Sequence, residues 1–297
     1  MSQPLVSVVT VCRNAAATLE TCIESVTAQT WPAIDYVVVD GASTDDTPAI
    51  LDRHRGAIAT LISEPDRGIY DAMNKGLARA RGEFVIFLNA DDRFAGPTAV
   101  ADAMAAIARA PGADIYYGSL EIRHGKDSMR HDPPPPSRAA EEMVLGCLPH
   151  QATFARRAVF DRTGPFDLRW RRHADYDWWL KVLADPALRL KRIDTVVASY
   201  AMGGASSELA KGQPEVFAIQ NEAALFRTPE WDRRRIEMYQ QAVLALRMEL
   251  MERNAGRAPW TQPHLVGRIR SWLVRSLPEP VVEAIRTAKR RLVGPRA

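Results

Sequence analysis

Short apolar runs alternate with amphipathic segments along the first hundred residues of the chain. Four runs are rich in β-branched or aromatic residues and too short for helices; they occupy residues 5–11, 36–39, 58–62 and 83–88. Between them, residues 18–29 and 71–80 repeat apolar positions at helical spacing. Thr47-Pro48 opens a third helix, because proline is tolerated in a first turn. Apolar strands separated by helices predict an α/β fold, with a mostly parallel sheet covered on both faces.

The pattern is less regular beyond residue 112. Residues 114–123 alternate like a strand, and the prolines at 133–136 predict an extended surface loop. Further elements are expected over 138–145, 152–154, 173–183, 196–201 and 229–254, helical except for the second and fourth. We therefore expect a sheet-containing domain over 1–212, with halves at about 1–112 and 113–212, followed by a helical extension over 213–297.

Polar residues follow each of the four early strands. They are Arg13-Asn14, Asp40-Gly41, Glu64-Pro65-Asp66-Arg67 and Asn89-Ala90-Asp91-Asp92. Ligands of open α/β sheets bind beyond the carboxyl ends of the strands, where these clusters would converge. Solvated loops would also be polar, but they would not need three acidic clusters at one edge. The sequence therefore predicts a binding site at this edge.

Asp91 and Asp92 are adjacent carboxylates directly after the buried run 84–88. A divalent cation held by a carboxylate can bridge a diphosphate and offset the charge that develops as the diphosphate leaves. One carboxylate suits the metal, and its neighbour suits ribose hydroxyls. The competing interpretation is an ordinary acidic turn, which the position after a buried strand disfavours.

Asp40 ends the second strand and precedes Gly41-Ala42-Ser43-Thr44. Its carboxylate can accept the imide N–H of a uracil ring, while Gly41 allows close backbone approach. An Asx turn that caps the next helix through Ser43 or Thr44 is the alternative, and the two are compatible.

Residues 64–76 join the third strand to a helix, whose start favours phosphate groups. Arg67 can pair with a diphosphate, and Asp66 can orient Arg67 or contact the base. The alternative for Asp71 and Lys75 is a surface ion pair worth about 0.2–0.5 kcal/mol.

Taken together in this order, the motifs resemble those of the inverting family 2 glycosyltransferases of GT-A fold. The matching segments are Thr10-Val11-Cys12-Arg13-Asn14, Asp40 to Asp45, Asn74-Lys75-Gly76, Asn89 to Asp92, and Ala174-Asp175-Tyr176-Asp177 with Lys181. The likeness covers roughly residues 5–205, and residues 64–76 resemble bacterial members that build extracellular polysaccharide or lipopolysaccharide.

The resemblance implies a single displacement with inversion, in which Asp175 is the catalytic base and Asp92 holds Mn²⁺ or Mg²⁺. It also implies a nucleotide-sugar donor of the UDP type, which contacts one set of residues. Those residues are Thr10, Arg13, Asn14, Asp40, Gly41, Ser43, Asp66, Arg67, Asn74, Lys75 and Asp91. The sequence departs from the family pattern at Asn89, where aspartate is usual, and at Ala174, where many members have glutamate.

Other residues are implied more weakly. His150, Gln151, Asp177, Trp178 and Gly204 stand where the family contacts the acceptor or the diphosphate. A structural role for His150 is an equal alternative. Adjacent tryptophans on a helix point in different directions, so at least one of Trp178 and Trp179 is expected in the core. For Gly204, a plain flexible turn competes with a loop that closes on the donor phosphates.

The net charge of +3 is unevenly distributed. Residues 264–297 contain eight Arg and Lys against two Glu, so they carry +6 and leave −3 for the rest of the chain. Apolar stripes flanked by these basic residues are typical of a peripheral contact with anionic membrane, and packing on the body is the alternative. Nucleic acid is a poor fit, since the body is acidic and no basic-aromatic interleaving occurs.

The three cysteines, Cys12, Cys22 and Cys147, form no metal-binding spacing and predict reduced thiols. The run 5–11 is too short for a secretion signal, and no apolar stretch is long enough to span a membrane. We therefore expect a cytoplasmic protein, peripheral on the inner face of the plasma membrane if the tail binds lipid.

Three functions follow from these patterns. The first is a glycosyltransferase acting on a glycan or polyprenyl-linked acceptor in the synthesis of cell-surface polysaccharide. The second is a catalytically silent scaffold that binds sugar nucleotides, which would not need the base Asp175. A nicotinamide-dependent oxidoreductase is disfavoured, because no GxGxxG follows the first strand.

Overall fold

The computed structural model describes residues 3–124, 127–201 and 209–253. Gly204 and the basic tail at 264–297 lie outside the described residues. The chain divides before Leu209 into two compact units, of which the first carries the sheet and the second is helical.

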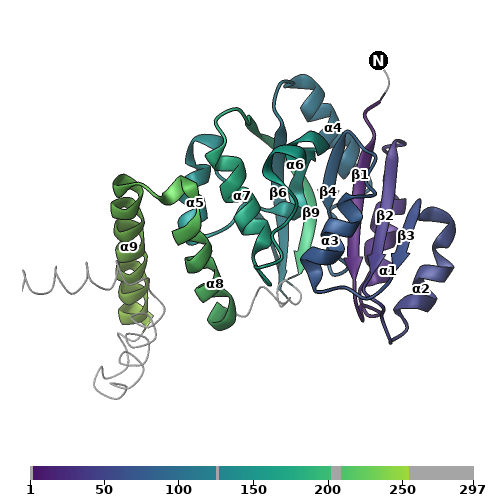
Figure 1. Cartoon of the computed structure of the whole chain (residues 1–297), viewed down its shortest axis with the longest axis horizontal. Helices are drawn as coiled ribbons and strands as arrows, with labels where there is room; N and C mark the ends of the chain where they lie inside the picture. The colour runs from purple at the N-terminus through teal and green to yellow at the C-terminus, as the bar shows by residue number, and fades with distance from the viewer. Residues whose placement is uncertain (1–2, 125–126, 202–208, 254–297) are drawn as a thin grey trace, which may run out of the picture. The chain divides into compact units, whose positions relative to one another are not determined.

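A mixed sheet of nine strands forms the centre of the first unit (Figure 1). The strands are β1 (Val6–Cys12), β2 (Ile34–Asp40), β3 (Thr60–Ser63), β4 (Phe84–Phe87), β5 (Arg93–Phe94), β6 (Ile115–His124), β7 (Asp127–His131), β8 (Thr153–Arg156) and β9 (Leu190–Ala201). Their order is β3-β2-β1-β4-β8-β6-β9-β5, with β7 paired to β6. The first four are parallel, and β8 runs antiparallel to both β4 and β6.

The parallel half of the sheet is apolar because both of its faces are covered. All seven residues of β1 are buried, which explains its continuous run of β-branched side chains. The register aligns Cys12 with Asp40, and Asp40 with Ser63. The carboxyl ends of these three strands therefore meet at one edge.

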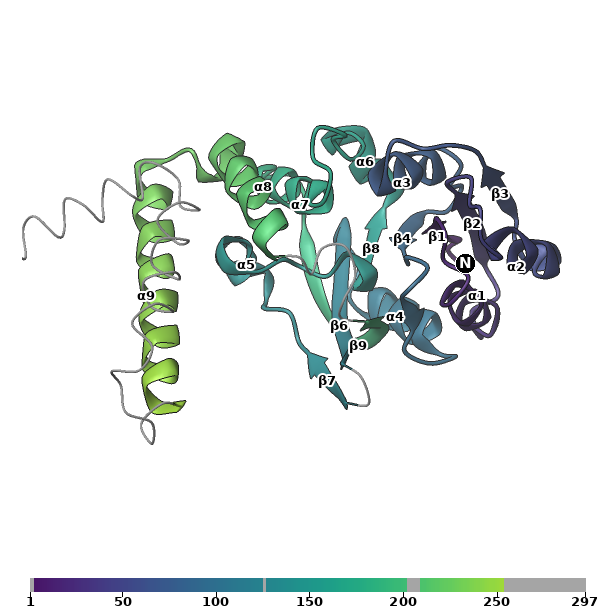
Figure 2. The same ribbon diagram turned by 90° about the horizontal axis from the view of Figure 1, so that it is seen from below.

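Helices pack on both faces of the sheet. They are α1 (Leu19–Thr27), α2 (Thr47–Arg53), α3 (Ile69–Leu77), α4 (Ala99–Arg109), α5 (Ala139–Leu145), α6 (Arg157–Thr163) and α7 (Ala174–Ala184). α1 and α4 lie on one face, and α3, α6 and α7 lie on the other (Figure 2). The predicted α/β fold with helices on both faces is thus confirmed.

Several helices and strands are not predicted by the pattern of apolar residues in the sequence. β5 has two residues, and β7 is a polar strand at the end of a hairpin, so neither carries a period that predicts a strand. The helices α4 and α6 were not predicted either. The expected strand over 196–201 is the second half of β9, which begins at Leu190.

The second unit contains α8 (Leu209–Glu222) and α9 (Pro229–Arg253), joined through a short 3₁₀ turn at Ala224–Phe226. The Tyr239 hydroxyl bonds Gln220 Oε1 at 3.1 Å, and its ring packs edge-on against Phe217. These contacts fasten the two helices together. Among the described residues, no helix combines the length and apolar character needed to cross a membrane.

Candidate active site

The loops after β1 and β2 are joined by hydrogen bonds between their predicted site residues. The backbone N–H of Asn14 donates to Ser43 Oγ at 2.8 Å, and Asn14 Oδ1 accepts from the Thr44 N–H at 2.9 Å. Asn14 has a φ of 51°, a left-handed conformation that asparagine tolerates better than most residues. Asn14 and Ser43 thus shape this edge of the sheet.

Asp40 is 1% exposed, and its carboxylate already has several donors. Ser43 donates through its backbone N–H and through Oγ, the latter at 2.5 Å from Oδ1, and Ser63 Oγ donates to Oδ2 at 2.7 Å. The turn that the sequence offered as an alternative is therefore present. A uracil contact by Asp40 stays a prediction.

Gly41 brings Arg13 and Asp66 close together. A Cβ at Gly41 would lie 2.0 Å from Asp66 Oδ2 and 3.3 Å from Arg13 Cδ, so only glycine leaves room for both side chains. Asp66 Oδ1 accepts the Gly68 N–H at 2.8 Å. Thr10, in contrast, is fully buried within the sheet.

The cations near the start of α3 are paired locally. Arg67 Nη2 lies 3.0 Å from Asp71 Oδ1, and Lys75 Nζ lies 2.8 Å from Glu64 Oε1. The expected pair between Asp71 and Lys75 is looser, at 3.7 Å. Arg67 is largely exposed and can leave its partner at little cost, since exposed ion pairs contribute about 1 kcal/mol or less.

Asn74 faces the second half of the domain. Its side-chain amide donates to the Phe166 carbonyl at 2.8 Å and accepts the Phe166 N–H at 2.9 Å. The structure therefore gives Asn74 a fastening role between α3 and the loop that precedes α7.

Asp92 is 2% exposed, and neither carboxylate oxygen has a hydrogen-bond partner among the described residues. Burial, followed by the charge of Asp91, raises the pKa of Asp92 to about 7. His150, Gln151 and Arg123 act in the opposite direction. Asn89 Oδ1 is a second buried acceptor without a partner in this part of the structure. Asp91 itself is exposed.

This carboxylate suits a divalent cation in one respect. A buried oxygen pair without donors is costly unless it is paired or binds a metal. Within the described residues, however, no three His, Cys, Asp or Glu side chains are grouped so that they could hold a metal ion by themselves. Mg²⁺ and similar ions are often bound by one or two carboxylates together with substrate phosphates and water, which is compatible with Asp92 as a lone protein ligand.

Asp175 lies in the first turn of α7 and is held from two sides. The Tyr70 hydroxyl lies 2.5 Å from Oδ1, and His150 Nδ1 lies 3.0 Å from Oδ2. Burial alone would raise the pKa of Asp175, but the hydrogen bond and charge of His150, together with Tyr70, lower it to about 2. The group is therefore a carboxylate at any physiological pH.

His150 connects the two acidic centres. Burial acts to lower its pKa, but Asp175, and then Asp92 and Asp91, outweigh burial and raise it. Its Nδ1 faces Asp175, while its Nε2 is buried and has no partner among the described residues. Gln151, the next residue, is also buried.

Trp178 and Asp177 do not face the same way as Asp175. Trp178 is buried, stacks on Phe160 with ring centroids 5.0 Å apart, and donates from Nε1 to Thr163 Oγ1 at 2.9 Å. Asp177 pairs with Lys181 at 2.7 Å. Trp179 is fully buried too, so both tryptophans belong to the core.

Tyr70 is the site residue that the sequence reasoning missed. It stands inside the segment 64–76 that was singled out, one helical turn before Asn74. A single tyrosine on a helix gives no signal of its partner, because Asp175 lies 105 positions further along the chain.

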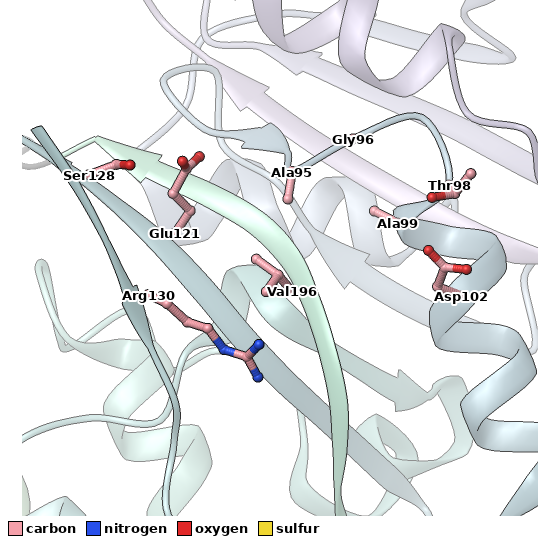
Figure 3. A pocket seen from close by; sticks show the side chains of 9 residues that line it. All are labelled: Ala95, Gly96, Thr98, Ala99, Asp102, Glu121, Ser128, Arg130 and Val196. Carbon is pink, nitrogen blue, oxygen red and sulfur yellow. The ribbon is translucent and has the colours of Figure 1, made fainter. Parts of the chain in front are cut away.

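A cavity of about 460 Å³ lies elsewhere, between α4 and the β6, β7 and β9 strands (Figure 3). Its lining includes Asp102, Glu121 and Arg130, and none of the predicted site residues contributes to it. Arg130 is engaged by Asp132 and Asp194, each at 2.7 Å.

Comparison with known proteins identifies the family. The sequence model described as Glycosyl transferase family 2 matches residues 7–161. The chain belongs to this family. A PGL/p-HBAD biosynthesis glycosyltransferase of Mycobacterium tuberculosis is 33% identical over 213 residues, which are 70% of this chain and 82% of that protein. The predicted family and the glycosyltransferase class are confirmed, although the range that the family model matches, residues 7–161, ends before Asp175.

Solved structures support the fold. S. aureus TarS 1–349 in complex with UDP-GlcNAc has a TM-score of 0.63 at 18% identity, covering 93% of this chain and 82% of that one. The mannosyltransferase PcManGT from Pyrobaculum calidifontis, in complex with GDP-Man and Mn²⁺, has a TM-score of 0.58 at 20% identity, covering 98% and 88%. At such identities the likeness concerns the fold alone, and it confirms the GT-A architecture of this family 2 glycosyltransferase.

Proposed function

We propose that this family 2 glycosyltransferase moves a sugar, with inversion, from a UDP-sugar to a hydroxyl group of a glycan or lipid-linked acceptor. The observation that carries the proposal is the Asp175 carboxylate, which is buried yet kept ionised by His150 and Tyr70. A buried carboxylate that is ionised and held by two partners can accept a proton from an acceptor hydroxyl, and strongly perturbed carboxyl groups cluster at functional sites.

In the proposed reaction, Asp175 takes the proton of the acceptor hydroxyl. As the proton leaves, the oxygen forms a bond to the anomeric carbon, on the face opposite the diphosphate. The bond between that carbon and the diphosphate oxygen breaks, and its electron pair leaves with the nucleoside diphosphate. Because the proton moves as the new bond forms, the hydroxyl becomes more acidic during the step, and a weakly basic carboxylate suffices.

Asp92 would hold the divalent cation, Mn²⁺ or Mg²⁺. Its two buried oxygens without donors support this role. When bound, such a cation offsets the negative charge that develops on the departing diphosphate. Asp91, exposed beside it, is our candidate for the ribose hydroxyls.

The donor nucleotide would lie along the ends of β1, β2 and β3. Arg13, Gly41 and Asp66 meet there, and Arg67 and Lys75 stand beside them as candidates for the diphosphate. A UDP-type donor is supported by TarS, which binds UDP-GlcNAc, although PcManGT binds GDP-Man.

The acceptor would belong to cell-surface glycan synthesis. The mycobacterial relative is named for PGL/p-HBAD biosynthesis, which supports an acceptor of this class. A lipid-linked acceptor would also agree with the basic residues at 264–297, if these contact the cytoplasmic face of a membrane.

A donor screen tests this function. Purified protein is given a panel of UDP- and GDP-sugars, including UDP-GlcNAc, with Mn²⁺ or Mg²⁺. Hydrolysis of the donor, in which water accepts the sugar, is measured as release of the nucleoside diphosphate.

We expect Asp175→Asn to bind UDP with unchanged Kd while its kcat falls by about 10²–10⁴. The exposed carboxylate Asp161 provides the control, since Asp161→Asn should retain turnover. Wild-type turnover by Asp175→Asn would exclude Asp175 as the base.

The metal assignment has its own variant. Asp92→Ala should lose turnover even at saturating Mn²⁺, because Asp92 is, among the described residues, the carboxyl group with both oxygens buried and without a hydrogen-bond partner. Full turnover by Asp92→Ala would show that another site holds the cation or that none is required. A protein that binds UDP-GlcNAc but releases no UDP with any metal would instead be the silent scaffold.

A further inference from the structure

Two side chains of helix α3 contact residues 166–172, the segment that precedes the proposed base Asp175. Tyr70 and Asn74 are four residues apart, so they lie on the same side of the helix. Asn74 bonds both backbone groups of Phe166, and the Tyr70 hydroxyl lies 2.8 Å from the Arg172 carbonyl. The ring of Tyr70 packs on that of Phe166, with centroids 5.6 Å apart.

The Tyr70 hydroxyl has one proton and two acceptors within reach. Asp175 Oδ1 lies at 2.5 Å and the Arg172 carbonyl at 2.8 Å. A hydrogen bond to a charged oxygen is the stronger of the two, so the Tyr70 hydroxyl donates to Asp175 while that group is a carboxylate. When Asp175 accepts a proton, the hydroxyl can turn to Arg172 without leaving its own proton unpaired.

We propose that Tyr70 is a positioning residue that orients the Asp175 carboxylate for proton transfer and keeps a partner throughout the step. This inference rests on the proposed role of Asp175 as base. His150 holds the second oxygen, so the carboxylate cannot rotate while both contacts exist. Without Tyr70, one oxygen would lose its donor, and the carboxylate would turn about its bond to the side chain.

The effect should fall on turnover and leave donor binding intact. Tyr70 is buried and points to Asp175 and Arg172, while the candidate residues for the nucleotide lie at the ends of β1 to β3. A misplacement of about 1 Å in a reacting group can cost about 10²-fold in rate. A purely structural tyrosine would instead lower stability and change KM and kcat together.

Tyr70→Phe tests the proposal, because it keeps the ring contact with Phe166 and removes only the hydroxyl. The matched control is Tyr116→Phe, which removes another buried hydroxyl that bonds the Ala110 carbonyl and the Ala113 N–H. Release of UDP from UDP-GlcNAc, or from the donor that the screen selects, gives kcat and KM. We expect kcat of Tyr70→Phe to fall about 10- to 100-fold with KM within twofold, while Tyr116→Phe keeps wild-type kcat. A wild-type kcat for Tyr70→Phe would overturn the proposal, as would an equal loss in both variants.

Asp175→Asn separates this proposal from the one on which it rests. If Asp175→Asn turns over at the wild-type rate, the base assignment fails. If Asp175→Asn is inactive and Tyr70→Phe is normal, only the role of Tyr70 fails.

Proton NMR of the wild-type chain provides a test that needs no folded Tyr70 variant. A hydroxyl proton in so short a bond to a carboxylate should resonate far downfield, persist in Tyr116→Phe and disappear in Asp175→Ala. Its absence from the wild-type spectrum, or its persistence in Asp175→Ala, would contradict the contact.

Discussion

Two buried aspartates of this enzyme have opposite titration behaviour because they have different partners. Asp92 has no donor among the described residues, and burial raises its pKa to about 7. Asp175 is also buried, but His150 and Tyr70 lower its pKa to about 2. Environments that push two carboxyl groups apart in pKa are a common way of assigning them different tasks. Here the pattern agrees with a cation ligand at Asp92 and an ionised base at Asp175.

The pair of His150 and Asp175 should stabilise the fold most at low pH. The folded protein raises the pKa of His150, so the stabilisation is complete below the unfolded value of about 6.5 and declines as pH rises through the folded value. His150→Gln should therefore lower the free energy of unfolding more at pH 6 than at pH 9. We expect a loss of about 1.5–3 kcal/mol at pH 6, as for a hydrogen bond to a charged group.

Urea unfolding at the two pH values measures this difference. His54→Gln is the matched control, since His54 also faces a carboxylate, Glu20, at 3.3 Å, but on a half-exposed surface. That variant should cost less than about 1 kcal/mol. A loss for His150→Gln that grows from pH 6 to pH 9 would contradict the pairing.

Helix α3 is packed closely on β1. A Cβ at Gly76 would lie 2.4 Å from Val9 Cγ1 and 3.4 Å from Val39 Cγ2, so an alanine there would force the helix away from the sheet. Both Tyr70 and Asn74 lie on this helix, and their contacts with residues 166–172 depend on its position. The glycine of the Asn74-Lys75-Gly76 motif thus serves the site through packing.

Gly76→Ala should destabilise the fold although alanine favours helices. Overpacking costs about 1–3 kcal/mol, and the helical preference returns about 1 kcal/mol, so a net loss of up to about 2 kcal/mol is expected in urea unfolding. Gly56→Ala is the control, because nothing lies within 4 Å of its added Cβ. Equal stability of the two variants would show that α3 can shift without cost.

The sequence predicted the elements whose apolar residues form a clear pattern, and the site residues that follow them stay predictions. The strands β1 to β4 each contain a short apolar run, and the polar clusters after them include Asp40, Asp66 and Asp92. β5 and β7 have no period of their own, since they form by pairing with β9 and β6. The contact of Tyr70 with Asp175 depends on how α3 packs against the loop before α7, which no local pattern contains.

For the whole molecule, the uneven charge leads us to propose that residues 264–297 contact an anionic membrane surface. Residues 264–297 carry +6, and each basic residue close to an anionic surface contributes about 1 kcal/mol. Replacing Arg290 and Arg291 with Glu should therefore weaken binding to phosphatidylserine vesicles by at least about 2 kcal/mol, roughly 30-fold.

The control replaces Arg233 and Arg247, exposed residues of α9, with Glu and makes the same change in net charge. Flotation with vesicles measures binding, which should also fall as salt rises from about 0.1 M to 1 M. Equal losses in both variants would mean that overall charge, and not the tail, attracts the protein to the lipid.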